Sequence, residues 1–131
     1  MGENFSKDRK AYFPPITHPY VQTGVLARES RFSEEEWSSL MDVARTFRYF
    51  VIESKYGYVD RLANAFNHRI AEVAVMEALR EARSAADAGE KVHIPSETHV
   101  IKVVELMKKD LSAAKVLAAL ALAFPEKRGE E

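Results

Sequence analysis

The strongest constraint on the fold is a nearly uninterrupted apolar run from residue 111 to residue 124. Lys115 is its only charged residue, and alanine, leucine and valine make up most of the rest. A helix that is apolar on most sides has to be surrounded by other elements. The run is also shorter than the roughly 20 residues of a membrane-spanning helix. We therefore predict that it forms the central helix of a bundle, where small alanines allow close approach.

A helix is predicted from residue 33 to about residue 55. Ser33 and Glu36 have the spacing of a capping box, in which each side chain accepts a hydrogen bond from the other's backbone amide. Gly57 is the expected stop signal. Apolar residues recur at three- and four-residue intervals, which predicts one buried stripe. That stripe comprises Trp37, Leu40, Met41, Ala44, Phe47 and Val51.

A second helical region is predicted from about residue 58 to Gly89, because glycine suits the left-handed position past a helix end. Asn64 and Asn67 are poor helix formers, so the region is either one helix or two with a break near 67–68. The predicted buried positions are Val59, Leu62, Ala63, Phe66, Ile70, Val73, Met76, Leu79 and Ala82.

Residues 90–94 are expected to form a short β-leaning connector. Ser96 is the expected cap of the next helix, and Asp110 either interrupts that helix or caps the last one. The inner face of the helix after Ser96 is predicted from its spacing. It comprises Val100, Val103, Val104 and Met107.

Together these elements predict an all-α fold, a compact bundle of four to five helices over residues 33–125. Residues 1–32 contain Pro14, Pro15 and Pro19, so an irregular N-terminal arm is expected there. The arm is either a tail or a segment that reaches a partner. Residues 126–131 form a charged C-terminal tail.

Net charge and cysteine content exclude several classes of protein. The formal net charge is -1, so no overall field attracts nucleic acid or anionic lipid, and polyanion binding would need local clusters. The absence of cysteine excludes disulfides, thiolate zinc sites and thiol nucleophiles. The first residues contain no apolar core of signal-peptide length, so a cytoplasmic protein is expected. The charged content of 30% leans towards a thermophile's composition.

Catalytic and metal-binding patterns are largely missing from the sequence. It has no Gly-rich phosphate loop and no serine elbow, so we expect neither catalysis nor a cofactor. No two histidines have the spacing at which one helix offers two ligands to an ion, which favours surface or capping roles over a metal site. The four are His18, His68, His93 and His99. A further set, interpreted as a solvated face with short-range ion pairs, is Glu77, Arg80, Glu81 and Arg83.

Basic residues gather in two parts of the sequence, and Tyr49, Tyr56 and Tyr58 are interleaved with the first group. Lysine and arginine attract a phosphate backbone, and tyrosine stacks on bases or bonds phosphates. The other explanation is that these cations cover the outside of a bundle while the tyrosines lie at the edge of its core. The candidate nucleic-acid-binding residues are Arg45, Arg48, Lys55, Arg61, Arg69, Lys102, Lys108, Lys109 and Lys115.

Three segments in the middle and at the end of the chain carry a family resemblance. They are Tyr-Gly-Tyr-Val-Asp-Arg-Leu-Ala-Asn-Ala at 56–65, Glu-Ala-Leu-Arg at 77–80, and Lys-Lys-Asp-Leu-Ser-Ala-Ala-Lys at 108–115. Together they resemble the archaeal small subunit of the subtype I-A CRISPR Cascade complex. The similarity covers roughly residues 45–124.

The resemblance implies a non-catalytic role. In that family, several copies line the inner surface of a crRNA-guided surveillance complex and support the guide–target hybrid and the displaced DNA strand. Base pairing supplies sequence specificity, and the protein contributes charge and shape. The resemblance makes Arg61, Lys108, Lys109 and Lys115 the candidate backbone contacts. The implied partners are crRNA, target DNA, the backbone and large subunits of the complex, and copies of the chain itself, with no membrane.

Two other functions stay open from the sequence. One is a helical adaptor or regulatory oligomer that acts through protein–protein contacts without nucleic acid and uses the Ala-rich last helix as its interface. The other is an enzyme assembled from scattered residues such as His68, Asp60 and Arg61. That function would require these three residues to line a closed pocket.

Overall fold

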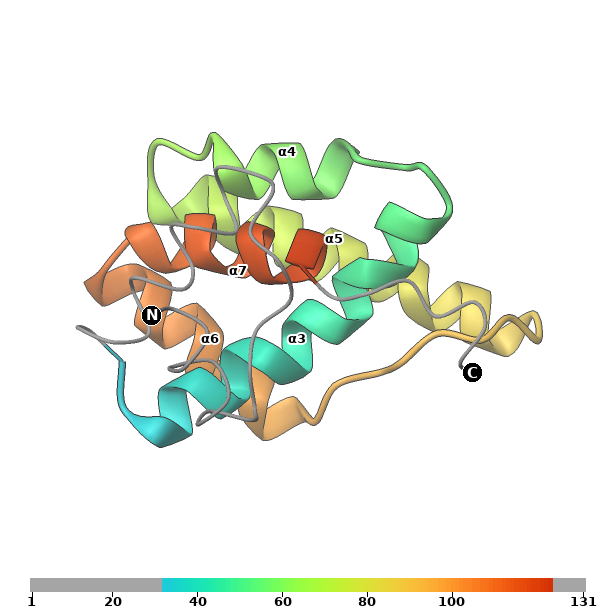
Figure 1. Ribbon diagram of the computed structural model, residues 1–131, viewed down its shortest axis with the longest axis horizontal. Coiled ribbons are helices and arrows are strands. Elements are labelled where there is room, and N and C mark those ends of the chain that lie inside the picture. The colour runs from blue at the N-terminus through green and yellow to red at the C-terminus, as the bar shows by residue number, and fades with distance from the viewer. Residues whose placement is uncertain (1–31, 124–131) are drawn as a thin grey trace, which may run out of the picture.

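The apolar run forms α7 (Ser112–Ala123), the helix around which the others are arranged. The computed structural model describes residues 32–123, in which α7 contacts α3 (Glu34–Ile52), α4 (Gly57–Ala63) and α6 (Glu97–Lys109) (Figure 1). All but one of the α7 residues from Ala113 to Ala121 are buried, and Lys115 is the exception. The central position predicted for the run is therefore confirmed.

The remaining helix, α5 (His68–Asp87), packs on α4, α6 and α3 and lies at the back of the bundle in Figure 1. Residues 32–123 form five α-helices and no strand, which confirms the predicted all-α fold. The N-terminal arm before Phe32 and the charged tail lie outside the described residues. No helix between residues 32 and 123 has the length and apolar content needed to span a membrane.

The start of α3 agrees with the sequence and its end does not. Ser33 and Glu36 form the predicted capping box, with backbone-to-side-chain hydrogen bonds of 3.0 and 3.1 Å. The helix ends at Ile52, and Ser54, two residues later, adopts a left-handed φ of 59°. The amides of Ser54 and Lys55 then donate to carbonyls one turn back, at 3.1 and 2.7 Å. Gly57 begins α4 instead of stopping α3, because serine takes the position where glycine was expected.

The second helical region is two helices, as one of the two sequence alternatives proposed. The side chain of Asn67 accepts a hydrogen bond from the amide of Ile70 at 3.0 Å. The break at 64–67 therefore ends in a capped start of α5. Gly89 has a φ of 93°, and its amide donates to the Ala86 carbonyl. This confirms its predicted role after the helix end.

Ser96 caps α6 as predicted, by accepting the amide of His99 at 3.4 Å. Asp110 meets both expectations placed on it. Its extended backbone ends α6, and its carboxylate accepts the amide of Ser112, at 3.1 Å, where α7 begins. The connector between α5 and α6 contains no strand, so its β-leaning composition produces only an extended loop.

The predicted buried face of α5 is partly wrong. Val73 and Met76 are 47% and 43% exposed, and Phe66 in the preceding connector is 78% exposed. The buried face includes the predicted Leu79 and Ala82, and its other members are Ala71, Ala74, Val75 and Ala78. Both faces have helical spacing, and the alanine-rich one allows α5 to approach its neighbours closely.

Candidate nucleic-acid interface

The nine candidate basic residues are distributed over all five described helices and the connector after α3. Three of them form ion pairs with carboxylates: Lys55 with Glu81 at 3.1 Å, Arg61 with Glu77 at 2.9 Å, and Lys102 with Glu35 at 3.2 Å. These pairs join different elements, since Glu77 and Glu81 lie on α5 and Glu35 lies on α3. Their cations therefore have partners within the chain.

Arg61 is held more closely than the other paired cations. Its guanidinium lies 5.2 Å from the centroid of the Tyr58 ring, in addition to the pair with Glu77. The Tyr58 hydroxyl donates to Glu81 at 2.9 Å, and Lys55 donates to the other oxygen of the same carboxylate. These contacts fasten α4 and the residues before it to α5, which gives Arg61 an architectural role.

The interleaved tyrosines are largely engaged as well. The rings of Tyr49 and Tyr58 each pack edge-to-face on Phe50, which favours the core-edge explanation over base stacking. The Tyr49 hydroxyl donates to Glu90 at 2.7 Å, and this bond is the main cause that raises the pKa of Tyr49 to about 12. Burial and the bond to Glu81 raise the pKa of Tyr58. Tyr56 is 45% exposed.

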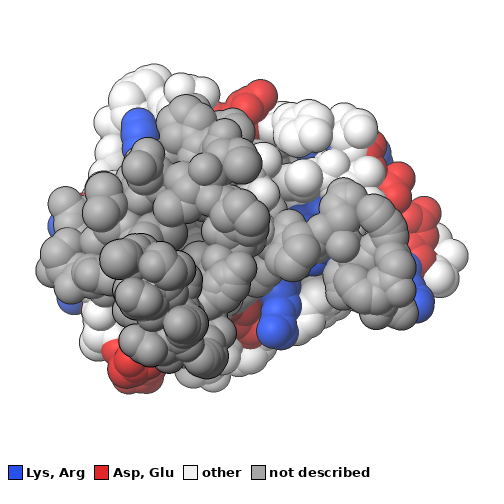
Figure 2. Space-filling view, in the orientation of Figure 1, with Lys and Arg blue, Asp and Glu red and all other residues white. Residues whose placement is uncertain are grey.

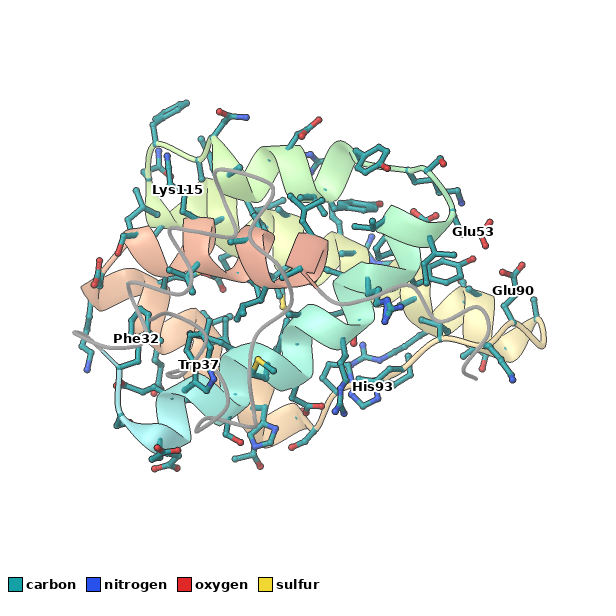
Figure 3. All side chains as sticks on the ribbon, viewed as in Figure 1. Phe32, Trp37, Glu53, Glu90, His93 and Lys115 are labelled. Atoms are coloured by element: carbon teal, nitrogen blue, oxygen red, sulfur yellow. The ribbon has the colours of Figure 1, made fainter. Side chains whose placement is uncertain are left out.

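Lys108, Lys109 and Lys115 are different, because all three are exposed and none has a carboxylate partner within the part of the chain that the structure describes. Lys108 and Lys109 occupy the last turn of α6, where the helix dipole also favours cations, and Lys115 lies in the first turn of α7. Figure 3 labels Lys115 at this end of the bundle, and Figure 2 shows blue atoms along the same margin. We call these three residues the lysine end.

The remaining three candidates lie on other elements. Arg45 is exposed on α3, and Arg69 is exposed in the first turn of α5. Arg48 on α3 is half-buried and already makes a contact. These three arginines therefore lie on α3 and α5, and not on the two helices that carry the lysine end.

A polar cluster that the sequence did not predict lies on α3. Nε2 of His93 lies 2.5 Å from Oδ1 of Asp42, and Nδ1 of His99 lies 2.7 Å from Oδ2. The Ser96 amide donates to the same carboxylate at 2.9 Å. Two histidines that lie six residues apart therefore meet on one aspartate. Their sequence separations from Asp42, 51 and 57 residues, left no local pattern to find.

The electrostatics of this cluster favour an ionised aspartate. Burial by itself would raise the pKa of Asp42, but the bonds from His99, the Ser96 amide and His93 lower it to about 2. A carboxylate only accepts hydrogen bonds, so both imidazole nitrogens that face it donate. Residues 32–123 contain no group of three His, Cys, Asp or Glu side chains arranged to hold a metal. His68 is exposed at the start of α5, and His18 lies outside the described residues.

Asp42 belongs to a row of three polar residues on α3, which we call the α3 polar stripe: Asp42, Thr46 and Tyr49. Thr46 donates to the His93 carbonyl at 2.7 Å, and Tyr49 bonds Glu90. The connector thus runs along α3 and is bonded to it at three successive points, as the positions of Glu90 and His93 in Figure 3 show. The stripe holds the connector in place.

The candidate enzyme residues do not line a pocket, and the carboxylates of the charged set on α5 pair with other segments. His68, Asp60 and Arg61 are all exposed, so they do not line a closed pocket. The carboxylates of Glu77 and Glu81 turn to Arg61 and Lys55 instead of pairing along α5. The segment is a solvent-facing set with ion pairs, as interpreted, but the pairs reach Arg61 and Lys55 on neighbouring segments and not Arg80 or Arg83.

Comparisons of the chain with protein-family models, with curated proteins and with solved structures gave no match.

Proposed function

We propose that this chain is a non-catalytic small subunit of a crRNA-guided surveillance complex and that the lysine end contacts nucleic-acid backbone. The observation that carries the proposal is the gathering of Lys108, Lys109 and Lys115, exposed and without a carboxylate partner among the described residues, where α6 meets α7. Backbone contact requires solvent-exposed cations that can replace counterions, and these three lysines are exposed. The resemblance noted for residues 108–115 supports the same place.

The overall charge supports a role inside an assembly. A protein that captures nucleic acid alone usually has a clear basic excess, whereas this chain has a formal net charge of -1. A subunit that its neighbours hold in position manages with a few contacts, because tethering supplies the effective concentration. The isolated protein is therefore expected to bind weakly, and its contribution is expected to grow in the complex.

A matched pair of triple variants tests the site. K108Q/K109Q/K115Q removes the lysine end, and K55Q/R61Q/K102Q removes the same charge from paired positions. Fluorescence anisotropy with labelled single-stranded DNA over a range of salt is expected to show weaker binding and a log–log salt slope smaller by about 2 for the first variant only. Equal losses of DNA binding in both variants would mean that net charge alone matters, and would contradict the assignment of the lysine end as the binding site.

The surveillance complex itself needs a separate test. A tagged copy of the chain, purified from its native host, is expected to bring down other subunits and short RNAs that carry repeat-derived ends. Recovery of the chain without such RNA would contradict its proposed place in a surveillance complex. The proposed contact with nucleic-acid backbone would then depend on the two triple variants alone.

The adaptor alternative needs a surface other than the last helix. Ala113, Ala114, Ala118, Ala119 and Ala121 are each at most 1% exposed, so they are already used inside the chain. One observation favours protein contacts elsewhere, namely the exposed side of α5.

A further inference from the structure

The exposed side of α5 carries a row of residues that alternate in steps of four and three. We call this row the α5 outer face: Arg69, Val73, Met76, Arg80 and Arg83. All five are exposed. Steps of four and three place side chains on one line along a helix, the line that a second helix would follow. The spacing therefore fits an elongated partner.

The centre of this face is apolar without being used in the fold. Val73 and Met76 are 47% and 43% exposed, while the opposite side of α5 supplies the core contacts. Methionine adapts to irregular partners, and methionine and arginine are enriched in protein interfaces. Covering these two side chains would remove apolar surface from water.

Three of the charged residues on this face are arginines, and Asp87, four residues after Arg83, is the one acidic residue that continues the row. Arg69, Arg80 and Arg83 have no ion pair with any carboxylate in residues 32–123. Two carboxylates within one turn of Arg80 and Arg83, those of Glu77 and Glu81, pair with Arg61 and Lys55 instead. The face therefore presents three guanidinium groups beside an apolar pair, and a guanidinium matches a carboxylate with two parallel hydrogen bonds.

We propose that the α5 outer face binds an acidic amphipathic helix of a partner protein. The partner would place apolar side chains on Val73 and Met76, and carboxylates opposite Arg69, Arg80 and Arg83. A second copy of this face is disfavoured, because an antiparallel copy would put Arg69 opposite Arg80 and bring like charges together. A nucleic-acid backbone would satisfy the arginines but leave Val73 and Met76 without an apolar partner.

The test uses two designed helical peptides with the same apolar positions, one flanked by glutamates and the other by lysines, and a single-stranded oligonucleotide. Titration into the ¹⁵N-labelled chain is expected to give amide shifts confined to α5 for the acidic peptide alone. R80E/R83E is expected to weaken the acidic peptide at least tenfold and to gain binding of the lysine peptide. R45E/K91E has the same change of charge at exposed positions outside α5, and is expected to leave the acidic peptide unaffected.

Several results would overturn the proposal. No binding of the acidic peptide, equal binding of both peptides, or an equal loss in both charge-reversed variants would each do so. Shifts on α5 caused by the oligonucleotide and not by the peptide would reassign the face to nucleic acid. Since all four substituted residues are exposed, circular dichroism is expected to show unchanged folding, and R80Q/R83Q repeats the test if R80E/R83E does not fold.

Discussion

The α3 polar stripe and the α5 outer face have the same helical spacing, but only the residues of the α3 polar stripe are bonded to another part of the described chain. On α3, Asp42, Thr46 and Tyr49 all bond the connector between α5 and α6. On α5, none of the arginines of the outer face has a carboxylate partner within residues 32–123. Spacing alone places polar groups in a row, and what the rest of the chain brings to that row decides its use.

The difference separates polar groups that stabilise the fold from charged groups that are free to bind a ligand. A polar group whose partners lie in the same chain stabilises the fold, and its loss is measured as stability. A cation without such a partner contributes little to folding and can exchange water for a ligand. The largest effects of substitution on stability are therefore expected on α3, and the smallest on the outer face of α5.

Replacing Asp42 with alanine is expected to cause the largest loss. Asp42→Ala leaves the Ser96 amide and two imidazole nitrogens without their acceptor, at a site where the aspartate side chain is only 16% exposed. Urea unfolding is expected to show a decrease in the free energy of unfolding of about 2–4 kcal/mol. Asp87→Ala, at an exposed position of α5, is the matched control, with a change within about 0.5 kcal/mol. Equal effects in the two variants would remove the contrast between the helices.

Acid is expected to remove the same contribution without a mutation. The pKa of Asp42 falls from an ordinary 3.8 to about 2 in the folded chain, so the folded state favours the ionised form. The resulting stability, about 2 kcal/mol, is present above the unfolded pKa and is lost as the pH falls from 3.8 through 2. Denaturant titrations at several pH values are expected to show this acid-dependent loss in the wild type and its absence in Asp42→Asn. Parallel pH profiles for the two proteins would contradict the assignment.

The Tyr49 end of the stripe is exposed and is expected to matter less. Glu90→Gln removes the charged acceptor of the Tyr49 hydroxyl, so the pKa of Tyr49 is expected to fall from about 12 towards its ordinary 10. Stability near neutral pH is expected to change by less than about 1 kcal/mol. The tyrosine titration is followed by NMR of ¹³C-labelled ring carbons, with Glu105→Gln as the control. An unchanged Tyr49 titration in Glu90→Gln would show that this bond does not form in solution.

The smallest effects are expected on the α5 outer face. Arg80→Ala and Arg83→Ala each remove a cation without a carboxylate partner among the described residues, so unfolding is expected to change by no more than about 0.5 kcal/mol. Arg61→Ala removes both an ion pair and a ring contact, and is expected to cost slightly more, about 0.5–1 kcal/mol. Thermal unfolding of the three variants side by side gives the order. A large loss at Arg80 or Arg83 would mean that the outer face supports the fold.

Local signals in the sequence were sufficient for much of the fold. The all-round apolar composition predicted α7 as the central helix, and Ser33, Gly89 and Ser96 marked helix boundaries correctly. These features depend on interactions within a few residues of one another, which spacing and residue type describe well. The left-handed conformation of Ser54 was not predicted, because serine in that conformation gives no signal in the sequence of the kind that glycine gives.

Contacts between segments that are distant in the sequence could not be predicted from it. The periodic apolar residues of α5 fitted two faces, and only packing against α4, α6 and α3 selected the one that contains Ala71, Ala74 and Ala78. For the same reason, the partners of Lys55 and Arg61 and the meeting of His93 with His99 depend on contacts between distant segments. For the candidate basic residues, the sequence could not show which ones form ion pairs with carboxylates and which ones stay exposed without such a pair.

The central place of α7 also sets an order of events during synthesis. α3 leaves the ribosome long before its main packing partners, because α6 and α7 lie more than forty residues further along the chain. Until α7 emerges, Leu40, Val43 and Phe47 of α3 have no complete core in which to be buried. Translation at roughly 5–20 residues per second then leaves this apolar side uncovered for seconds. The nascent chain is exposed to chaperones and to aggregation for that interval.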